Sequence, residues 1–235
     1  MIAASIAILS SAAVVSTGFA AWVISGGDTK EATGKITADT VSNSYHTITL
    51  GTANKTEINF GAPVDDNTVT NPWLKNNSMG QEKLLAEFTF TVGNVKTGKD
   101  SPKDLFSSIS FSAGTDSTYK AASDKGLVSA LPTSWAKEAF DTTVPSYDSR
   151  TGKGSAAGIY LVKNPDTAAT EAGAAIGFTL YIQFTWGQNF GGMNPFYFYN
   201  DGNKTASADG NSAQSNLDIV AAIQNVGFTL TIKAN

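Results

Sequence analysis

The chain has 235 residues, with 16 lysines and arginines against 20 acidic residues, one histidine and no cysteine. The formal net charge of −4 argues against a nucleic-acid partner, because nucleic-acid-binding proteins normally present a basic surface. The lack of cysteine excludes disulfide scaffolds and thiol nucleophiles, and a Ser-His-Asp triad would have to use His46. We therefore expect neither an enzyme nor a bound cofactor.

Residues 1–27 form the most recognisable segment. No charged side chain occurs in residues 1–24, which is typical of an export signal or, if the segment is retained, of a membrane helix. The run Thr17-Gly18-Phe19-Ala20 supplies a signal-peptidase site. We expect a secreted protein, located outside the cell or on its surface, that contacts the membrane only through this segment before cleavage.

Residues 28–235 read as one β-rich domain. The clearest strand covers residues 176–186, where Phe178, Leu180 and Ile182 alternate with polar or tyrosine side chains. Similar alternation occurs at residues 45–50, 56–60, 84–95, 109–111, 159–161 and 228–232. Period-two alternation without βαβ spacing predicts an all-β protein, an antiparallel β-sandwich or jelly roll.

A few short helices are expected to cross over the ends of the strands. Ser101-Pro102-Lys103-Asp104 has the pattern of a capping box with proline at the first helical position. Residues 132–140 predict one or two helical turns, and Ser215-Asn216-Leu217-Asp218 forms a second capping box before residues 219–224. The pattern predicts no separate helical layer.

The densest aromatic cluster lies in residues 186–200. Four consecutive aromatic residues cannot all face inward in a strand, so one face of residues 196–199 is expected to be accessible. Such rings can stack on sugars, which makes an extracellular polysaccharide a candidate partner. The candidate ligand-binding residues are Trp186, Phe196, Tyr197 and Tyr199. The alternative is that the phenylalanines fill the core while the tyrosines pack under the following loop.

A polar stretch after this cluster repeats an Asp-Gly-Asn tripeptide. Closely spaced oxygen ligands can hold Ca²⁺, and the weak candidate ligands are Asp201, Asn203, Asp209 and Asn211. The spacing departs from that of an EF-hand, and Asp-Gly and Gly-Asn are also common hairpin-turn pairs. Tight turns are therefore the alternative to a calcium site.

The run Gly18-Phe19-Ala20-Ala21-Trp22 resembles the signals of Gram-positive proteins cleaved by the signal peptidase SipW, among them the TasA and camelysin biofilm-matrix proteins. The rest of the chain is similar in layout, being cysteine-free and rich in Thr and Asn, with alternating strands and a hydrophobic last strand. The resemblance implies a jelly-roll fold and self-association into extracellular fibres of a biofilm matrix.

Members of that family assemble by donor-strand complementation, in which the N-terminal segment of one subunit completes the sheet of the next. The resemblance implies that residues 28–41 are the donor segment here. A donated strand pairs the backbone of an open edge, and a contact that does not close on itself builds a filament. The residues expected to carry polymerisation are Ile36, Ala38, Thr40 and Val41. The alternative is that residues 28–41 pair with their own domain or stay disordered.

Two other functions use the same features differently. A monomeric surface adhesin or carbohydrate-binding module would bind ligands through the aromatic cluster. A type IV pilin-like subunit would retain residues 1–24 as the packing helix of a filament and display the β domain outside.

Overall fold

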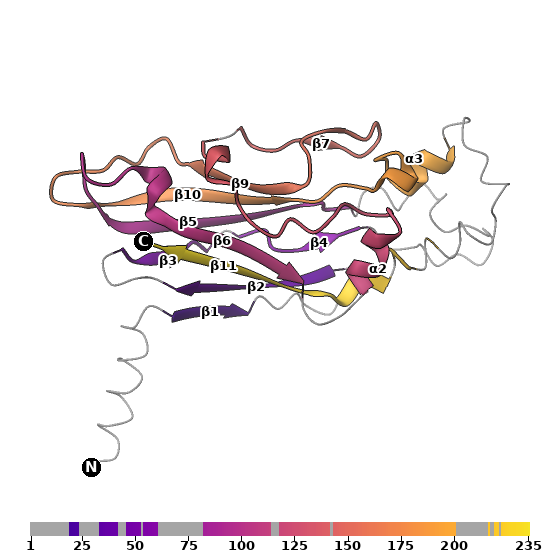
Figure 1. The fold of residues 1–235 in the computed structure, drawn as a ribbon, viewed down its shortest axis with the longest axis horizontal. Coiled ribbons are helices and arrows are strands. Elements are labelled where there is room, and N and C mark those ends of the chain that lie inside the picture. The colour runs from indigo at the N-terminus through magenta and orange to yellow at the C-terminus, as the bar shows by residue number, and fades with distance from the viewer. Residues whose placement is uncertain are drawn as a thin grey trace, which may run out of the picture.

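Strands account for most of the regular structure, and those of two sheets run along the long axis of the view in Figure 1. The computed structural model describes residues 19–23, 33–41, 46–52, 54–60, 82–113, 118–141, 143–200, 216, 219–220 and 222–235. Within these ranges no helix is long and apolar enough to cross a bilayer. The coarse class prediction is confirmed, since the protein is mostly β and most of its strand pairs are antiparallel.

The first sheet brings together strands from both ends of the sequence. Its order is β1, β2, β11 and β6, and β4 pairs with the start of β2. Their bounds are β1 (Phe19–Val23), β2 (Thr33–Val41), β4 (Ile58–Asn59), β6 (Phe106–Ala113) and β11 (Gly227–Ala234). β2 and β11 run parallel, whereas the other pairs in this sheet are antiparallel. The sequence pattern gives no sign of this parallel pair.

The second sheet has the order β3, β5, β10 and β9, with antiparallel neighbours throughout. Its strands are β3 (Ile48–Leu50), β5 (Leu85–Val95), β9 (Gly158–Lys163) and β10 (Ala174–Gln183). A separate short hairpin joins β7 (Tyr147–Asp148) to β8 (Lys153–Gly154). The alternation predicted for β5 is confirmed, because Phe88, Phe90 and Val92 are buried and Thr91 is exposed.

Both sheets contribute to one hydrophobic core. Phe106 of β6 lies with its ring centroid 5.2 Å from that of Phe178 in β10 and 5.8 Å from that of Phe90 in β5. All three rings are at most 2 % exposed. Because these rings come from different sheets, their contacts hold the sheets together, and burial of aromatic area supplies much of the driving force.

The outer face of β10 differs from the prediction. The alternation predicts Thr179 and Gln183 to face solvent, but both are buried. Thr179 Oγ1 donates to Asn164 Oδ1 at 2.9 Å, and Gln183 Nε2 donates to the carbonyl of Leu84 at 3.2 Å. Neighbouring segments therefore cover this face of the strand, and each of these two side chains has a hydrogen-bond partner.

The helices are short. They comprise α2 (Thr118–Asp124), α3 (Pro195–Asn200) and the 3₁₀ turns η3 (Pro102–Leu105), η4 (Lys137–Ala139), η5 (Gln188–Phe190) and η6 (Ala222–Asn225). η3 and η4 lie where helical turns are predicted, but the Ser101 side chain makes no capping hydrogen bond. The predicted capping box at residues 215–218 lies outside the described residues, apart from Asn216.

Phe178→Ala should lower the free energy of unfolding by about 3–5 kcal/mol, because it leaves a cavity where the two sheets meet. Val144→Ala is the control, since Val144 is 51 % exposed, and should change it by less than about 0.5 kcal/mol. Urea unfolding followed by fluorescence measures both. Similar values for the two variants would show that the sheets are not held together at Phe178.

Candidate functional site

The expected donor segment lies within the chain's own first sheet. β2 pairs with β11 over seven positions, from Lys35 opposite Gly227 to Val41 opposite Lys233. Ile36, Ala38 and Thr40 stand opposite residues of β11 whose side chains are at most 1 % exposed, namely Phe228, Leu230 and Ile232. Val41 stands opposite the exposed Lys233. This segment therefore pairs with its own domain, which is the alternative to a donated strand.

Trp186, one of the candidate ligand-binding aromatics, is buried. It is 2 % exposed, and its ring packs edge-on against Phe60 at 5.6 Å and Phe190 at 5.8 Å. Tyr197 is half-buried, with the Arg150 guanidinium carbon 5.2 Å from its ring centroid. The side chains of Phe196 and Tyr199 lie outside the described residues. Sugar stacking by Tyr197 stays a prediction.

Residues 195–200 form the helix α3 rather than a strand. Two glycines with positive φ, Gly191 at 59° and Gly192 at 73°, turn the chain before it. Pro195 suits the first helical position because its φ is fixed and its missing N–H is not needed there. In a helix neighbouring residues no longer alternate between two faces, so the argument from a two-faced strand does not apply.

The four weak calcium candidates, Asp201, Asn203, Asp209 and Asn211, lie outside the described residues. Within the part of the chain that the structure describes, no group of three or more His, Cys, Asp or Glu side chains is placed to hold a metal ion. The calcium hypothesis therefore stays a prediction.

His46 is buried beside the connection that follows β5. Its Nδ1–H donates to the Gly93 carbonyl at 3.2 Å, and its Nε2 lies 3.9 Å from Asp100 Oδ1. Asp100 in turn accepts the Lys96 backbone N–H at 2.8 Å. These contacts link the segment just before β3 to β5, through Gly93, and to the connection between β5 and η3, through Asp100, which is a structural role for the imidazole.

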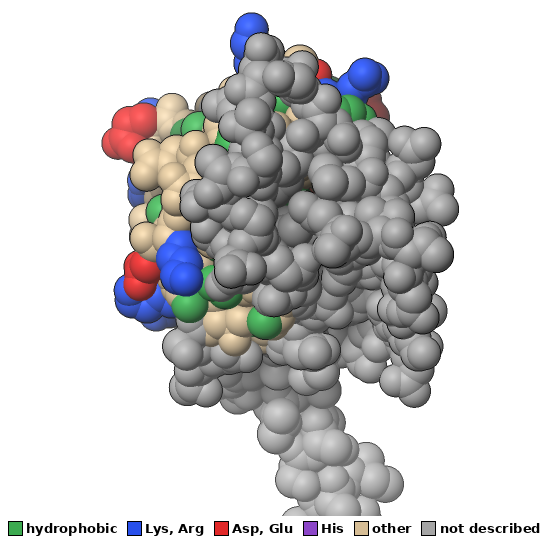
Figure 2. Space-filling model, turned by 90° about the vertical axis from the view of Figure 1, so that its right-hand side faces the viewer, with side chains coloured by type: hydrophobic (Ala, Val, Ile, Leu, Met, Phe, Trp, Pro, Cys, Tyr) green, Lys and Arg blue, Asp and Glu red, His purple; other side chains and the backbone are tan. Residues whose placement is uncertain are grey.

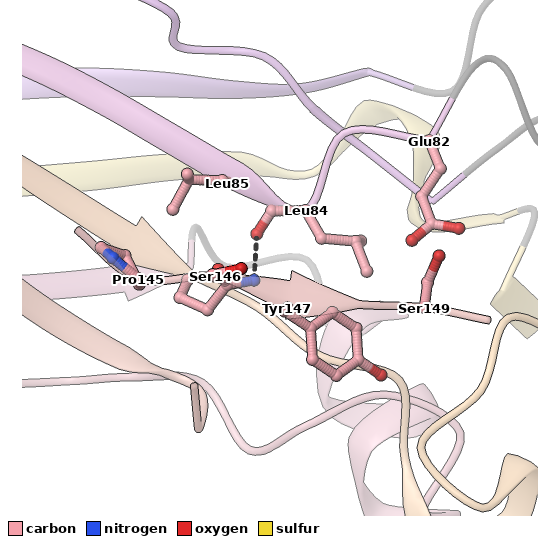
Figure 3. A pocket seen from close by; sticks show the side chains of 8 residues that line it. Glu82, Leu84, Leu85, Pro145, Ser146, Tyr147 and Ser149 are labelled. Carbon is pink, nitrogen blue, oxygen red and sulfur yellow. Dashed lines mark hydrogen bonds between the residues drawn. The ribbon is translucent and has the colours of Figure 1, made fainter. Parts of the chain in front are cut away.

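A partly buried polar cluster surrounds Glu82, at a pocket of about 370 Å³. Figure 3 shows the Glu82 carboxyl facing the Ser149 hydroxyl, with the Tyr147 ring nearby. The pocket is lined by Glu82, Leu84, Leu85, Pro145, Ser146, Tyr147, Ser149 and Gln183. It lies between the start of β5, the end of β10 and the β7–β8 hairpin, so three separate segments build it.

A fourth segment, residues 191–194, is tied to the same cluster. Asn194 is fully buried; its side-chain amide donates to the Glu82 carboxylate and its backbone N–H donates to the Ser149 carbonyl at 2.7 Å. The Tyr147 hydroxyl donates to the Gly192 carbonyl and accepts the Trp186 backbone N–H at 3.2 Å. We call these residues, Glu82, Tyr147, Ser149, Trp186, Gly192 and Asn194, the Glu82 junction.

Burial dominates the electrostatics of the junction. It raises the pKa of Glu82 above its ordinary value of 4.5, although hydrogen bonds from Asn194, Ser149 and Trp186 favour the carboxylate, and nearby Asp148 raises the pKa further. Burial also raises the pKa of Tyr147 to about 12. The Asn194 amide holds the Glu82 carboxyl in place, and the protonation state of this carboxyl is coupled to the stability of the surrounding segments.

Asp148 has a separate role at the surface. Its carboxylate accepts the Arg150 backbone N–H at 2.9 Å and the Thr151 hydroxyl at 3.0 Å, and these bonds lower its pKa. The two neighbouring carboxyls therefore have different roles: Glu82 belongs to the junction, whereas Asp148 caps the turn between β7 and β8. Each carboxyl is explained by its structural contacts, so we assign the pair no acid–base chemistry.

Nothing in the sequence marks Glu82. It sits in an ordinary polar run before β5, and its partner Asn194 lies 112 residues away. The run of residues 190–195 does stand out, because paired glycines, asparagine and proline follow a buried aromatic strand. The structure shows why: the glycines turn the chain and Asn194 reaches Glu82.

Comparisons with known proteins identify no relative. No family model matches the chain, and no curated protein and no solved structure among those searched matches it either. Function must therefore be argued from the chain's own geometry.

Glu82→Gln should remove a pH dependence of stability. Because the folded-state pKa is raised, the protonated carboxyl favours folding, and this contribution is complete below pH 4.5 and is lost as the pH rises through the raised value. Each unit by which folding raises the pKa corresponds to about 1.4 kcal/mol in the free energy of unfolding. Thermal unfolding between about pH 4 and pH 8 should show wild type losing stability relative to the variant.

The control is Glu57→Gln, since the Glu57 carboxylate is exposed and pairs with Lys83 at 3.0 Å on the surface. It should follow the wild-type pH dependence. Parallel pH curves for wild type and Glu82→Gln would contradict the coupling.

Gly152→Ala tests the close approach of the β7–β8 turn to residues 191–192. An added Cβ would lie 2.7 Å from the Gly191 carbonyl oxygen, and the φ of Gly152 is 67°. Gly98→Ala is a matched control, because its φ is 71° with nothing within 4 Å. The control should lose about 1–2 kcal/mol from backbone strain alone, and Gly152→Ala about 1–3 kcal/mol more. If chemical denaturation showed the same loss of unfolding free energy for both variants, the β7–β8 turn would not lie tightly against residues 191–192.

Proposed function

We propose that the protein is a secreted structural subunit that assembles into extracellular fibres by exchanging its N-terminal strand between copies. The observation that supports this proposal is the parallel pairing of β2 with β11. A strand close to the beginning of the chain pairs with the last strand, and the rest of the core is built from residues that follow it.

The position of β2 makes exchange geometrically simple. It precedes β3 in the chain, and only residues 42–47 connect the two. A connection of six residues can span up to about 20 Å when extended, so β2 can leave its own sheet without threading a loop. A second copy's β2 would then re-form every backbone bond that the first one lost.

Departure of β2 leaves a defined acceptor site. β11 stays paired with β6, including Leu230 opposite Phe111 and Ile232 opposite Ile109. Its other edge would present unpaired backbone groups beside the buried row of Phe228, Leu230 and Ile232. Such an edge strongly favours adding a strand. Ile36, Ala38 and Thr40 of the donor would occupy the positions opposite that row.

The finer fold and the location belong to the same proposal. Two sheets that share one aromatic core are consistent with a sandwich of the jelly-roll kind. An uncharged N-terminal segment supports export. Figure 2 looks onto the end of the molecule at which α2 and α3 lie, and basic and acidic side chains are interspersed on the described part of this face. A mixed surface of this kind is compatible with a structural role.

Introduced cysteines test the exchange directly, because the natural chain has none. Thr37 and Thr229 are register partners, and adjacent strands lie about 4.8 Å apart, within the range of a disulfide. In residues 28–235 carrying Thr37→Cys and Thr229→Cys, exchange should give filaments by electron microscopy and a ladder of covalent multimers on a non-reducing gel.

The control pair is Thr37→Cys with Thr231→Cys, because Thr231 is the partner of Asp39. Two residues of displacement put the Cα atoms about 8 Å apart, too far for a disulfide. This variant should form filaments without a ladder. If the T37C/T229C variant instead stayed a monomer, with its two introduced thiols joined within one chain and no filaments, the proposed function would be overturned.

A further inference from the structure

We propose that β1 is an internal cap on the outer edge of β2, and that its removal with the N-terminal segment opens this edge and permits strand exchange. This inference rests on the proposed function and adds a way in which assembly is regulated. The observation behind it is the antiparallel pairing of β1 with β2, which runs from Phe19 opposite Val41 to Val23 opposite Thr37.

β1 and β11 occupy opposite edges of β2. The sheet order places β2 between them, so residues 37–41 have a strand on each side in the full chain. The first residues of β2 add a contact with β4, through Thr33 opposite Asn59 and Gly34 opposite Ile58. In this state β2 cannot leave unless it breaks its pairings with β11 and β4 and either breaks the pairing with β1 or carries β1 along.

The cap lies within the segment expected to be cleaved. Cleavage after Ala20 would divide β1, and cleavage at any later point up to residue 27 would remove more or all of it. The outer edge of β2 would then present unpaired N–H and C=O groups over the stretch that β1 had covered. Once all five residues of β1 are removed, β2 is held by β11 and β4 alone, so it should open more often.

The pairing of β1 with β2 is also short enough to be lost easily. β1 has only five residues, of which Ala20 and Ala21 are small, whereas β2 and β11 pair over seven positions. The shorter pairing is the easier one to lose. Before cleavage, however, it adds to the contacts that β2 must break, so an uncleaved chain is protected from premature assembly.

The test compares the full chain in mild detergent with residues 28–235, and adds a synthetic peptide of residues 17–25 to the shorter chain. Hydrogen exchange at residues 37–41 should be at least about tenfold slower in the full chain, and saturating peptide should restore this protection. The same peptide should slow formation of the T37C/T229C multimer ladder. A peptide with Ala21→Pro is the control, because proline removes a donor and disfavours the strand.

The outcomes separate the two proposals. Equal exchange rates at residues 37–41 in both chains, with no effect of the peptide, would overturn the cap whether or not filaments form. Filaments that grow at the same rate with and without bound peptide would also overturn it and leave the fibre function standing. Protection by the peptide without any filaments would refute the fibre function and, with it, the role of the cap in assembly.

Discussion

The parallel contact between β2 and β11 is the constraint on which the first sheet depends. Parallel neighbours cannot be joined by a tight hairpin and need a long crossover. Here the crossover is nearly the whole chain, since everything from β3 to η6 lies between them. Closing so long a loop has an entropy cost that must be met before the strands pair. β2 is therefore expected to join a largely formed core late in folding.

The remaining core is well placed to persist without β2. Phe228 of β11 stacks on Phe111 of β6 at 5.4 Å and contacts Tyr119 of α2 at 5.7 Å. Phe184, which follows β10, lies 5.6 Å from the same ring. The last strand is thus anchored through side chains on β6, α2 and the second sheet. β11 can keep its place while the edge beside it changes partner, which is what an acceptor strand requires.

The sequence predictions are right where a feature depends on residues close together in the chain, and wrong where it depends on contacts with distant segments. The two-residue alternation identified β5 and β11, because their buried rows of Phe88, Phe90 and Val92 and of Phe228, Leu230 and Ile232 are set by local geometry. It failed at Thr179, whose burial depends on Asn164 from another segment. The alternation assigns no strand to residues 196–199, where paired glycines and Pro195 start a helix.

The Glu82 junction was beyond sequence reasoning for the same reason. A carboxyl taken out of water is stable only if other segments bring it donors, and here Asn194, 112 residues away, donates to it. No spacing rule links residues so far apart. The parallel partner of β2 was equally hidden, because alternation assigns a strand its faces but not its neighbours.

The Glu82 junction and β2 are physically separate features. No described residue of the junction belongs to β1, β2 or β11. Its bonds fasten the second sheet to the β7–β8 hairpin and residues 191–194, whereas β2 belongs to the first sheet. Sites without shared partners usually contribute additively to stability. Under the fibre function that we propose, protonation of Glu82 should therefore change the stability of each subunit without changing which strand pairs with β11.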